Sequence, residues 1–104
     1  MGPGLSSLIA TPIRINIGNK NPTYPIVARI RGIEGTVLLE IDVDYVGLAS
    51  KVYVRKTSGY KILDRAAYDA VKEWIFVPAQ RYGKNVASSL HVPIRFNLSD
   101  SLQN

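Results

Sequence analysis

Few side chains in this sequence could do catalytic chemistry, and their spacing does not favour it. The only histidine, His91, has no nearby acidic or nucleophilic residue in an obvious geometry. The chain contains no Gly-x-Ser-x-Gly turn, no phosphate-binding glycine loop and no histidine cluster. A lone histidine on a strand is usually an ordinary surface residue, so we do not expect an enzyme.

The acidic stretch from Asp42 to Gly47 resembles the start of a calcium-binding loop, but it lacks two of the required ligands. The fifth position is Val46, and the twelfth position, where a chelating glutamate belongs, is Tyr53. The chain has no cysteine, which excludes disulfides, thiolate nucleophiles and cysteine metal sites. We therefore expect no metal and no cofactor.

The composition indicates one folded domain without a clustered basic surface. The chain has 104 residues, of which 46% are hydrophobic and 20% charged, and its net charge is +5. The basic residues are scattered from Arg14 to Arg95, so nucleic-acid binding, which needs a clustered footprint, is not expected. No apolar run reaches the roughly 20 residues of a membrane helix, and no signal peptide is visible.

The stretch from Lys61 to Pro78 predicts the helix around which the fold is organised. Its apolar residues recur three and four positions apart and so share one helix face: Leu63, Ala66, Ala67, Ala70, Val71 and Trp74. Asp64 suits the positive end of the helix dipole, and Pro78 ends the helix at or before Val77. We expect Trp74 to extend the same buried face.

Three further segments alternate apolar and polar residues and predict strands. Residues 35–43 and 48–55 form a hairpin around a turn at 44–47, and residues 90–98 form the last strand, while 13–17 is a weaker strand pattern. Pro25 begins a short helix whose apolar side is Ile26, Val27, Ala28 and Ile30, and Gly32 ends it. The predicted class is α+β, with a small antiparallel sheet of three or four strands and two helices packed on one face. Residues 1–19 are expected to be a flexible N-terminal segment, 20–98 the domain, and 99–104 a polar tail.

Pro93 predicts that the last strand lies at the edge of the sheet. Proline has no N–H to donate, so its backbone is expected to point away from the neighbouring strand. The backbones of His91, Arg95 and Asn97 share this parity and should point the same way. Two interpretations remain: an edge protected by proline and charge, which is the commoner case, or a docking edge for an extended peptide.

An ordered set of short motifs resembles the periplasmic C-terminal domain of TonB, the energy transducer of Gram-negative envelopes. The resemblance covers Tyr24 to Leu98 and departs from the family pattern only at the hairpin turn, where many members have Asp-Gly. The motifs are Tyr24-Pro25, Ala28-Arg29, Glu34-Gly35-x-Val37, Gly47, Val54, Ser58-Gly59-Tyr60, Leu63-Asp64-x-Ala66-Ala67, Ala70-Val71, Trp74-x-Phe76-x-Pro78-Ala79, Gly83 and Val92-Pro93-Ile94-x-Phe96.

The resemblance implies a non-enzymatic peptide-binding function. In this family the TonB box, a short extended segment of outer-membrane transporters, adds as a strand beside the last strand of the domain. Tyr24 and Pro25 correspond to a second receptor-contacting region. Carried onto this sequence, the residues implied to bind the box are Ser89, Leu90, His91, Val92, Pro93, Ile94, Arg95, Phe96 and Asn97.

The resemblance also implies a longer protein. Its N-terminal helix would anchor it in the inner membrane and associate with ExbB and ExbD, and a proline-rich spacer would cross the periplasm to this domain. The transporters would import iron-siderophores, haem, cobalamin or nickel. The alternative is a structural domain that dimerises through the same edge strand, although we expect the isolated chain to be a monomer.

Overall fold

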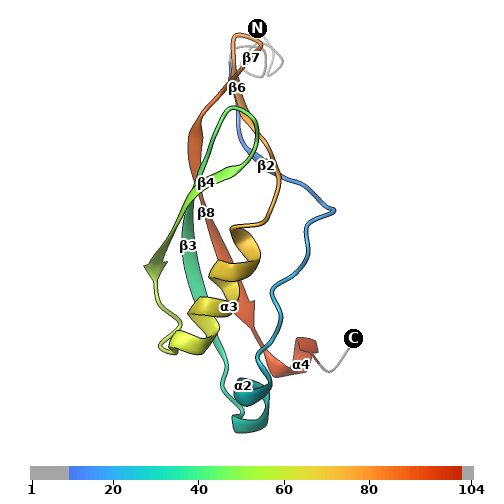
Figure 1. Cartoon of the computed structure of the whole chain (residues 1–104), viewed down its shortest axis with the longest axis vertical. Helices are drawn as coiled ribbons and strands as arrows, with labels where there is room; N and C mark the ends of the chain where they lie inside the picture. Colours follow the sequence, from blue (N-terminus) through green and yellow to red (C-terminus); the bar gives the residue numbers. More distant parts are fainter. Residues whose placement is uncertain (1–9, 102–104) are drawn as a thin grey trace, which may run out of the picture.

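A computed structural model describes residues 10–101 of the chain (Figure 1). The molecule is elongated, with the longest strands parallel to its long axis. The elements in chain order are β1 (Ala10–Thr11), β2 (Arg14–Ile15), α2 (Ile26–Arg31), β3 (Gly35–Val43), β4 (Ala49–Lys56), α3 (Lys61–Val71), β5 (Phe76–Val77), β6 (Ala79–Arg81), β7 (Lys84–Val86), β8 (Ser88–Phe96) and α4 (Leu98–Ser101).

The main sheet is antiparallel with the strand order β4-β3-β8, so the predicted hairpin and last strand are confirmed. Asp44 builds the turn of the β3–β4 hairpin. Its Oδ1 accepts hydrogen bonds from the backbone N–H groups of Val46, Gly47 and Leu48 at 3.0, 3.0 and 2.9 Å. Gly47 takes a φ of 101°, which glycine adopts without a Cβ penalty.

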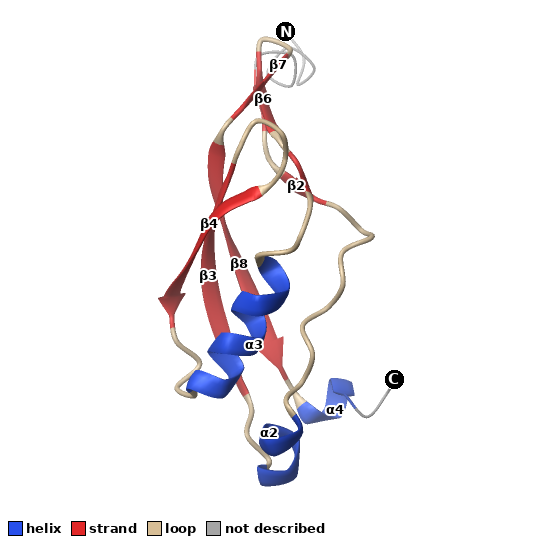
Figure 2. Ribbon diagram, viewed as in Figure 1, coloured by secondary structure: helices blue, strands red, loops and turns tan. Residues whose placement is uncertain are grey.

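The core lies between one face of this sheet and α3 (Figure 2). Every second side chain of β3 points into it, as the alternating sequence predicted. These side chains meet the apolar stripe of α3 and the even-numbered side chains of β8. The fully or nearly fully buried members are Val37, Leu39, Ile41, Val43, Leu63, Ala67, Val71, Val92, Ile94 and Phe96. The predicted α+β class is thereby confirmed.

Helix α3 ends at Val71, before Val77 as predicted, but it stops short of Trp74, which the apolar spacing had placed on the helix, so that part of the prediction was wrong. The backbone N–H of Trp74 still closes a turn on the carbonyl of Val71 at 3.0 Å, but the chain is extended from there. Phe76 and Val77 form β5 and pair with β2. Aromatic and β-branched residues favour an extended chain over a helix, and here a pairing partner is available. Trp74 nevertheless packs against the core, as predicted.

Helix α2 does not bury the apolar side that its sequence predicts. Only Ala28 is buried, whereas Ile26, Val27 and Ile30 are 74%, 50% and 79% exposed. The helix has six residues and lies at one end of the sheet, so only one of its positions reaches the core (Figure 1). Its predicted end is confirmed, because Gly32 takes the left-handed conformation with φ 69°.

Part of the segment predicted to be a flexible N-terminal lead-in forms strands. Within the predicted 13–17 strand, only Arg14–Ile15 is extended and paired, and its partner is β5 rather than the main sheet. Ala10–Thr11 pairs with β6, which forms a three-stranded sheet with β7. Residues 1–9 lie outside the described part of the chain.

Strand β8 ends at Phe96, so Leu98 does not continue it as the alternation predicted. The backbone N–H of Leu98 donates to Glu34 Oε2 at 2.8 Å, and α4 begins at this residue. A glutamate carboxylate thus accepts one of the N–H groups that a helix start leaves without a partner. Residues 102–104 of the predicted polar tail lie outside the described residues.

Candidate functional site: the outer edge of β8

Strand β8 pairs with β3 alone among the described strands, which makes it an edge strand. In the β3–β8 register Pro93 stands opposite Leu38. Because Pro93 cannot donate to β3, residues of its parity direct their backbone groups away from β3, and the even-numbered residues bond inward. Ser89 and His91 share the parity of Pro93. The edge position predicted from Pro93 is confirmed.

A groove of about 340 Å³ lies beside the C-terminal half of β8. One wall is β8 and the other is the extended segment that precedes α2. The lining residues are Asn21, Pro22, Tyr24, Arg29, Trp74, Pro93, Ile94, Arg95, Phe96 and Asn97. An extended peptide laid along β8 would therefore meet side chains on its far side as well.

Tyr24 joins the groove to the core. Its ring stands edge-on to Phe96, with centroids 5.4 Å apart and an interplanar angle of 79°, and its hydroxyl donates to the carbonyl of Ile33. The Arg29 guanidinium lies 5.6 Å from the ring centroid. Burial raises the pKa of Tyr24 above its usual value, the carboxylate of Glu34 raises it further, and Arg29 opposes both. The hydroxyl therefore remains a proton donor at neutral pH.

Side-chain hydrogen bonds hold the segment 16–24, which we call the strap, in place. Asn19 makes a double contact with the backbone of Ile75: its Nδ2 donates to the Ile75 carbonyl and its Oδ1 accepts from the Ile75 N–H, each at 2.8 Å. Trp74 Nε1 donates to the carbonyl of Lys20 at 2.7 Å. The strap thus stands beside the groove without being a strand of the main sheet.

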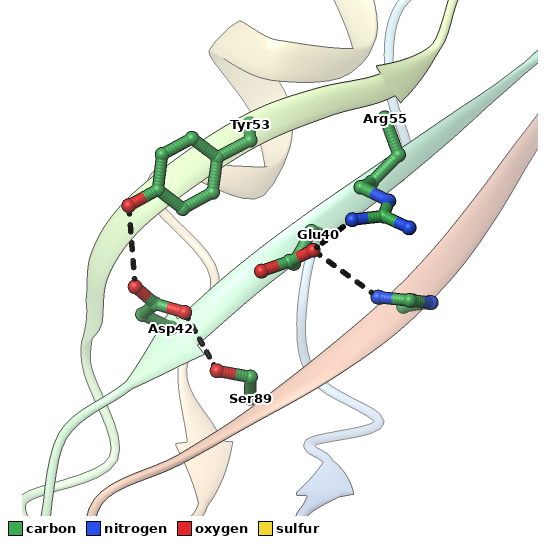
Figure 3. Close-up of polar contacts among 6 residues, drawn as sticks. Glu40, Asp42, Tyr53, Arg55 and Ser89 are labelled. Atoms are coloured by element: carbon green, nitrogen blue, oxygen red, sulfur yellow. Dashed lines mark hydrogen bonds and ion pairs between the residues drawn. The ribbon is translucent and has the colours of Figure 1, made fainter.

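The solvent-facing side of the main sheet carries a polar cluster centred on Glu40 (Figure 3). Glu40 Oε1 lies 3.3 Å from Arg55 Nη1 on β4 and 3.2 Å from His91 Nε2 on β8. The prediction that His91 has no partner was wrong, because Glu40, its cross-strand neighbour, is 51 residues away in the chain. The contact identifies His91 as a sheet-face residue and provides no nucleophile for it to activate.

Asp42 makes a second cross-strand link on the same face (Figure 3). Its Oδ1 accepts a hydrogen bond from Ser89 Oγ at 2.7 Å, and its Oδ2 accepts one from Tyr53 OH at 3.4 Å. Together with the Glu40 cluster it ties β8 to β3 and β3 to β4 through side chains. These links support the strand that would receive a guest.

The structure brings most of the sequence-predicted residues together, but not all. Ser89 to Phe96 lie on β8, Asn97 follows it, and Tyr24 packs edge-on against Phe96 at the groove. Pro25 instead lines a separate hollow beside α3. Sequence reasoning missed four groove residues: Asn21, Pro22, Arg29 and Trp74. The two prolines that hold residues 21–25 extended were the available signal for the first two, whereas the role of Trp74 depends on where α3 ends.

The described residues contain no cluster of three or more acidic or histidine side chains suited to a metal ion. The acidic stretch from Asp42 to Asp44 is used by the sheet face and the hairpin turn instead. No helix in residues 10–101 is long and apolar enough to cross a membrane.

Fold and groove together define a small α+β domain with an accessible strand edge, a class of domain suited to binding an extended chain. The model of the family "Gram-negative bacterial TonB protein C-terminal" matches residues 20–98, and the chain belongs to this family. Membership of this non-enzymatic family confirms the sequence-based prediction that the chain is not an enzyme.

Curated relatives and a solved structure are similar to this chain. It is 48% identical over 81 residues to protein tonB2 of Pseudomonas aeruginosa and 47% identical over 77 residues to protein TonB of Vibrio cholerae. These alignments cover 78% and 74% of this chain but 30% and 32% of the relatives, so the chain spans about a third of their length. The solution NMR structure of the Pseudomonas aeruginosa TonB CTD superimposes with a TM-score of 0.65 at 28% identity, covering 85% of each chain.

Proposed function

We propose that the outer edge of β8 binds the TonB box of an outer-membrane TonB-dependent transporter by β-strand addition. The observation that carries this proposal is the pairing of β8 with β3 alone among the described strands, with the 340 Å³ groove beside its C-terminal half. The guest would bond to the outward backbone groups of Ser89 and His91. Tyr24 would contact it from the strap side.

The expected free energy of peptide binding suits a reversible interaction. Each main-chain hydrogen bond contributes about 1 kcal/mol net. A five-to-seven-residue guest must also offset the cost of association and of its own ordering. We therefore expect an affinity on the order of micromolar, about 8 kcal/mol. A strand pulled along its length must shear several bonds at once, which suits the transmission of force.

The remainder of the proposal concerns the longer protein. Residues 20–98 would be its periplasmic C-terminal domain, anchored in the inner membrane through an N-terminal helix that associates with ExbB and ExbD. The domain would pass proton-motive energy to transporters for iron-siderophores, haem, cobalamin or nickel. Family membership and the similarity to curated TonB proteins support this reading.

An NMR titration with a peptide carrying a cognate TonB box tests the proposal. We expect the largest amide shift changes between Ser89 and Asn97, with smaller changes at Tyr24. Changes confined to β4 or to the β6–β7 hairpin, or none at millimolar peptide, would contradict it.

The competing function is dimerisation through the same edge, which would leave no place for a guest. Sedimentation velocity over a range of protein concentrations separates the two. A monomer at all concentrations supports the guest-binding proposal, whereas a dimer whose formation the TonB-box peptide does not reverse would favour the structural role.

A further inference from the structure

The six-residue helix α2 lies at one end of the elongated molecule (Figure 1). It exposes a stripe of aliphatic side chains there. Ile26 and Ile30 are 74% and 79% exposed, and Val27 beside them is 50% exposed. Ile26 and Ile30 are one helical turn apart and therefore adjacent on the surface. Single exposed aliphatic residues are ordinary on a protein surface. Three exposed aliphatic residues on a two-turn helix form a contiguous apolar patch, which is typical of an interaction site.

Two arginines flank this stripe, one on each side. At 100° per residue, the stripe of Ile26 and Ile30 lies opposite the buried Ala28, with Arg29 on one side and Arg31 next to Val27 on the other. Among the described residues neither arginine pairs with a carboxylate. Glu34, the nearest acidic residue in the chain, accepts the backbone N–H of Leu98. The tip therefore combines an apolar centre with a cationic rim.

We propose that this tip, Ile26, Val27 and Ile30 with Arg29 and Arg31, binds the surface of an anionic phospholipid bilayer. Aliphatic side chains flanked by arginines are typical of protein surfaces that bind at a membrane interface. The apolar groups enter the boundary between headgroups and acyl chains, and the guanidinium groups contact the lipid phosphates. The net charge of +5 adds a favourable long-range attraction to such a surface.

The shape and charge of the tip favour a lipid surface over the alternatives. A second copy of the chain would bring four arginines together around the paired stripes, and like charges at a contact are repulsive. A folded protein partner would need a concave apolar pocket with an acidic rim to receive a protruding short helix. A bilayer surface deforms around protruding side chains and needs no matching pocket.

The tip and the β8 groove share one residue. Arg29 lies over the Tyr24 ring at 5.6 Å and also lines the groove. The aliphatic stripe and Arg31 do not line the groove, so substitutions at these positions test lipid binding without changing a groove residue.

Flotation with phospholipid vesicles tests the proposal. We expect the chain to float with vesicles containing about a quarter phosphatidylglycerol and to remain behind with pure phosphatidylcholine, because the arginines contribute only on an anionic surface. The double variant Ile26→Gln/Ile30→Gln should lower the apparent lipid affinity about ten-fold. Arg31→Gln should lower it less and should weaken its salt dependence.

Two matched controls isolate the tip. Ile17 is fully exposed elsewhere on the molecule, so Ile17→Gln removes the same side chain and should leave lipid binding unchanged. Lys51→Gln removes one exposed charge from β4 and should change binding less than Arg31→Gln. Both tip isoleucines are solvent-exposed, so their variants should unfold at the wild-type temperature.

Three results would overturn the proposal. They are an absence of flotation with anionic vesicles at low salt, equal flotation of the wild type and the Ile26→Gln/Ile30→Gln variant, and a loss in Ile17→Gln as large as in the double variant. A concentration-dependent dimer that the double variant abolishes would instead assign the stripe to a second copy. None of these outcomes changes the result expected for the TonB-box titration.

Discussion

Trp74 Nε1 donates a hydrogen bond of 2.7 Å to the backbone carbonyl of Lys20. This bond joins the chain that leaves α3 to the strap that precedes α2, across 54 residues of sequence. Both Trp74 and the strap residues Asn21, Pro22 and Tyr24 line the groove beside β8. The Trp74 bond is thus one of the contacts that hold the strap wall of the groove in place, together with the double contact of Asn19 with Ile75 and the hydrogen bond from the Tyr24 hydroxyl to Ile33.

Replacing Trp74 with phenylalanine should loosen the strap while keeping an aromatic ring. The Lys20 carbonyl loses its donor, and we expect a cost of about 1 kcal/mol in the free energy of unfolding. Hydrogen exchange at the Ile75 amide, which donates to Asn19 Oδ1 of the strap, should become faster. Urea unfolding and amide exchange measure the two effects, with Tyr82→Phe, at an exposed hairpin position, as the control. Wild-type stability together with unchanged exchange at Ile75 would show that the bond does not hold the strap.

A proline at position 91 should block the guest without breaking the sheet. His91 has the parity of Pro93, so its backbone N–H points away from β3 and a proline there leaves the β3–β8 ladder intact. His91→Pro should raise the dissociation constant of a TonB-box peptide about ten-fold, the equivalent of one or two main-chain bonds.

His91→Ala is the matched control for this prediction. The alanine variant also loses the contact with Glu40, but it keeps the backbone N–H of residue 91. The dissociation constant of the peptide should therefore rise by less than about two-fold. Isothermal titration calorimetry on both variants measures the difference. Equal weakening by the two substitutions would mean that the guest is recognised through the imidazole rather than through the main chain.

The sequence predicted the parts of the fold in which local pattern and tertiary position agree. Alternation along β3 marked its buried face correctly, because one side of an antiparallel strand packs on α3 while the other faces water. Pro93 located the sheet edge because a missing N–H is a property of the residue itself. Those two signals were enough to place the candidate binding strand.

Other parts depended on contacts between residues far apart in the chain. The apolar periodicity continued through Trp74, yet pairing of Phe76 with Ile15 of β2 ended the helix earlier. The sequence assigned Ile26, Val27 and Ile30 to the inner side of α2, but the position of the helix at the end of the sheet leaves only Ala28 buried. The partner of His91 was likewise unpredictable before the β3–β8 register was known.

Alanine at Gly47 should be strongly destabilising. Gly47 has a φ of 101°, and a Cβ there would lie 2.2 Å from the carbonyl oxygen of Phe76, a backbone atom that cannot move aside. The Phe76 N–H also donates to the Gly47 carbonyl at 2.8 Å, so the clash would break the link between the hairpin turn and β5. We expect a loss of about 3 kcal/mol or more in the free energy of unfolding.

Gly59→Ala is the matched control for the clash. Gly59 has a similar φ of 96°, but beyond its chain neighbours no atom lies within 4 Å of the place that a Cβ would take. Its substitution should therefore carry only the conformational penalty of about 1–2 kcal/mol. Urea denaturation of both variants gives the comparison, and equal losses would show that the close approach of Phe76 to Gly47 contributes nothing.

Asp64 should make the stability of the domain depend on pH in the acid range. Its carboxylate accepts hydrogen bonds from the Thr57 hydroxyl and from the backbone and side chain of Ser58, which join the β4–α3 loop to the helix. Burial, the largest single influence, raises the pKa of Asp64, but these hydrogen bonds together outweigh it and hold the pKa below the usual value of 3.8. The stabilisation is therefore complete above that value and is lost as pH falls through the lower, folded-state pKa.

We expect Asp64→Asn to cost about 1 kcal/mol in the free energy of unfolding near pH 7, and we expect the difference from wild type to shrink below about pH 4. Urea denaturation across this range measures it, with Asp69→Asn, which removes an exposed partner of Arg65 and Lys72, costing a few tenths of a kcal/mol as the control. A difference between wild type and Asp64→Asn that stayed constant down to about pH 2 would mean that the charge of Asp64 is not what joins the loop to α3.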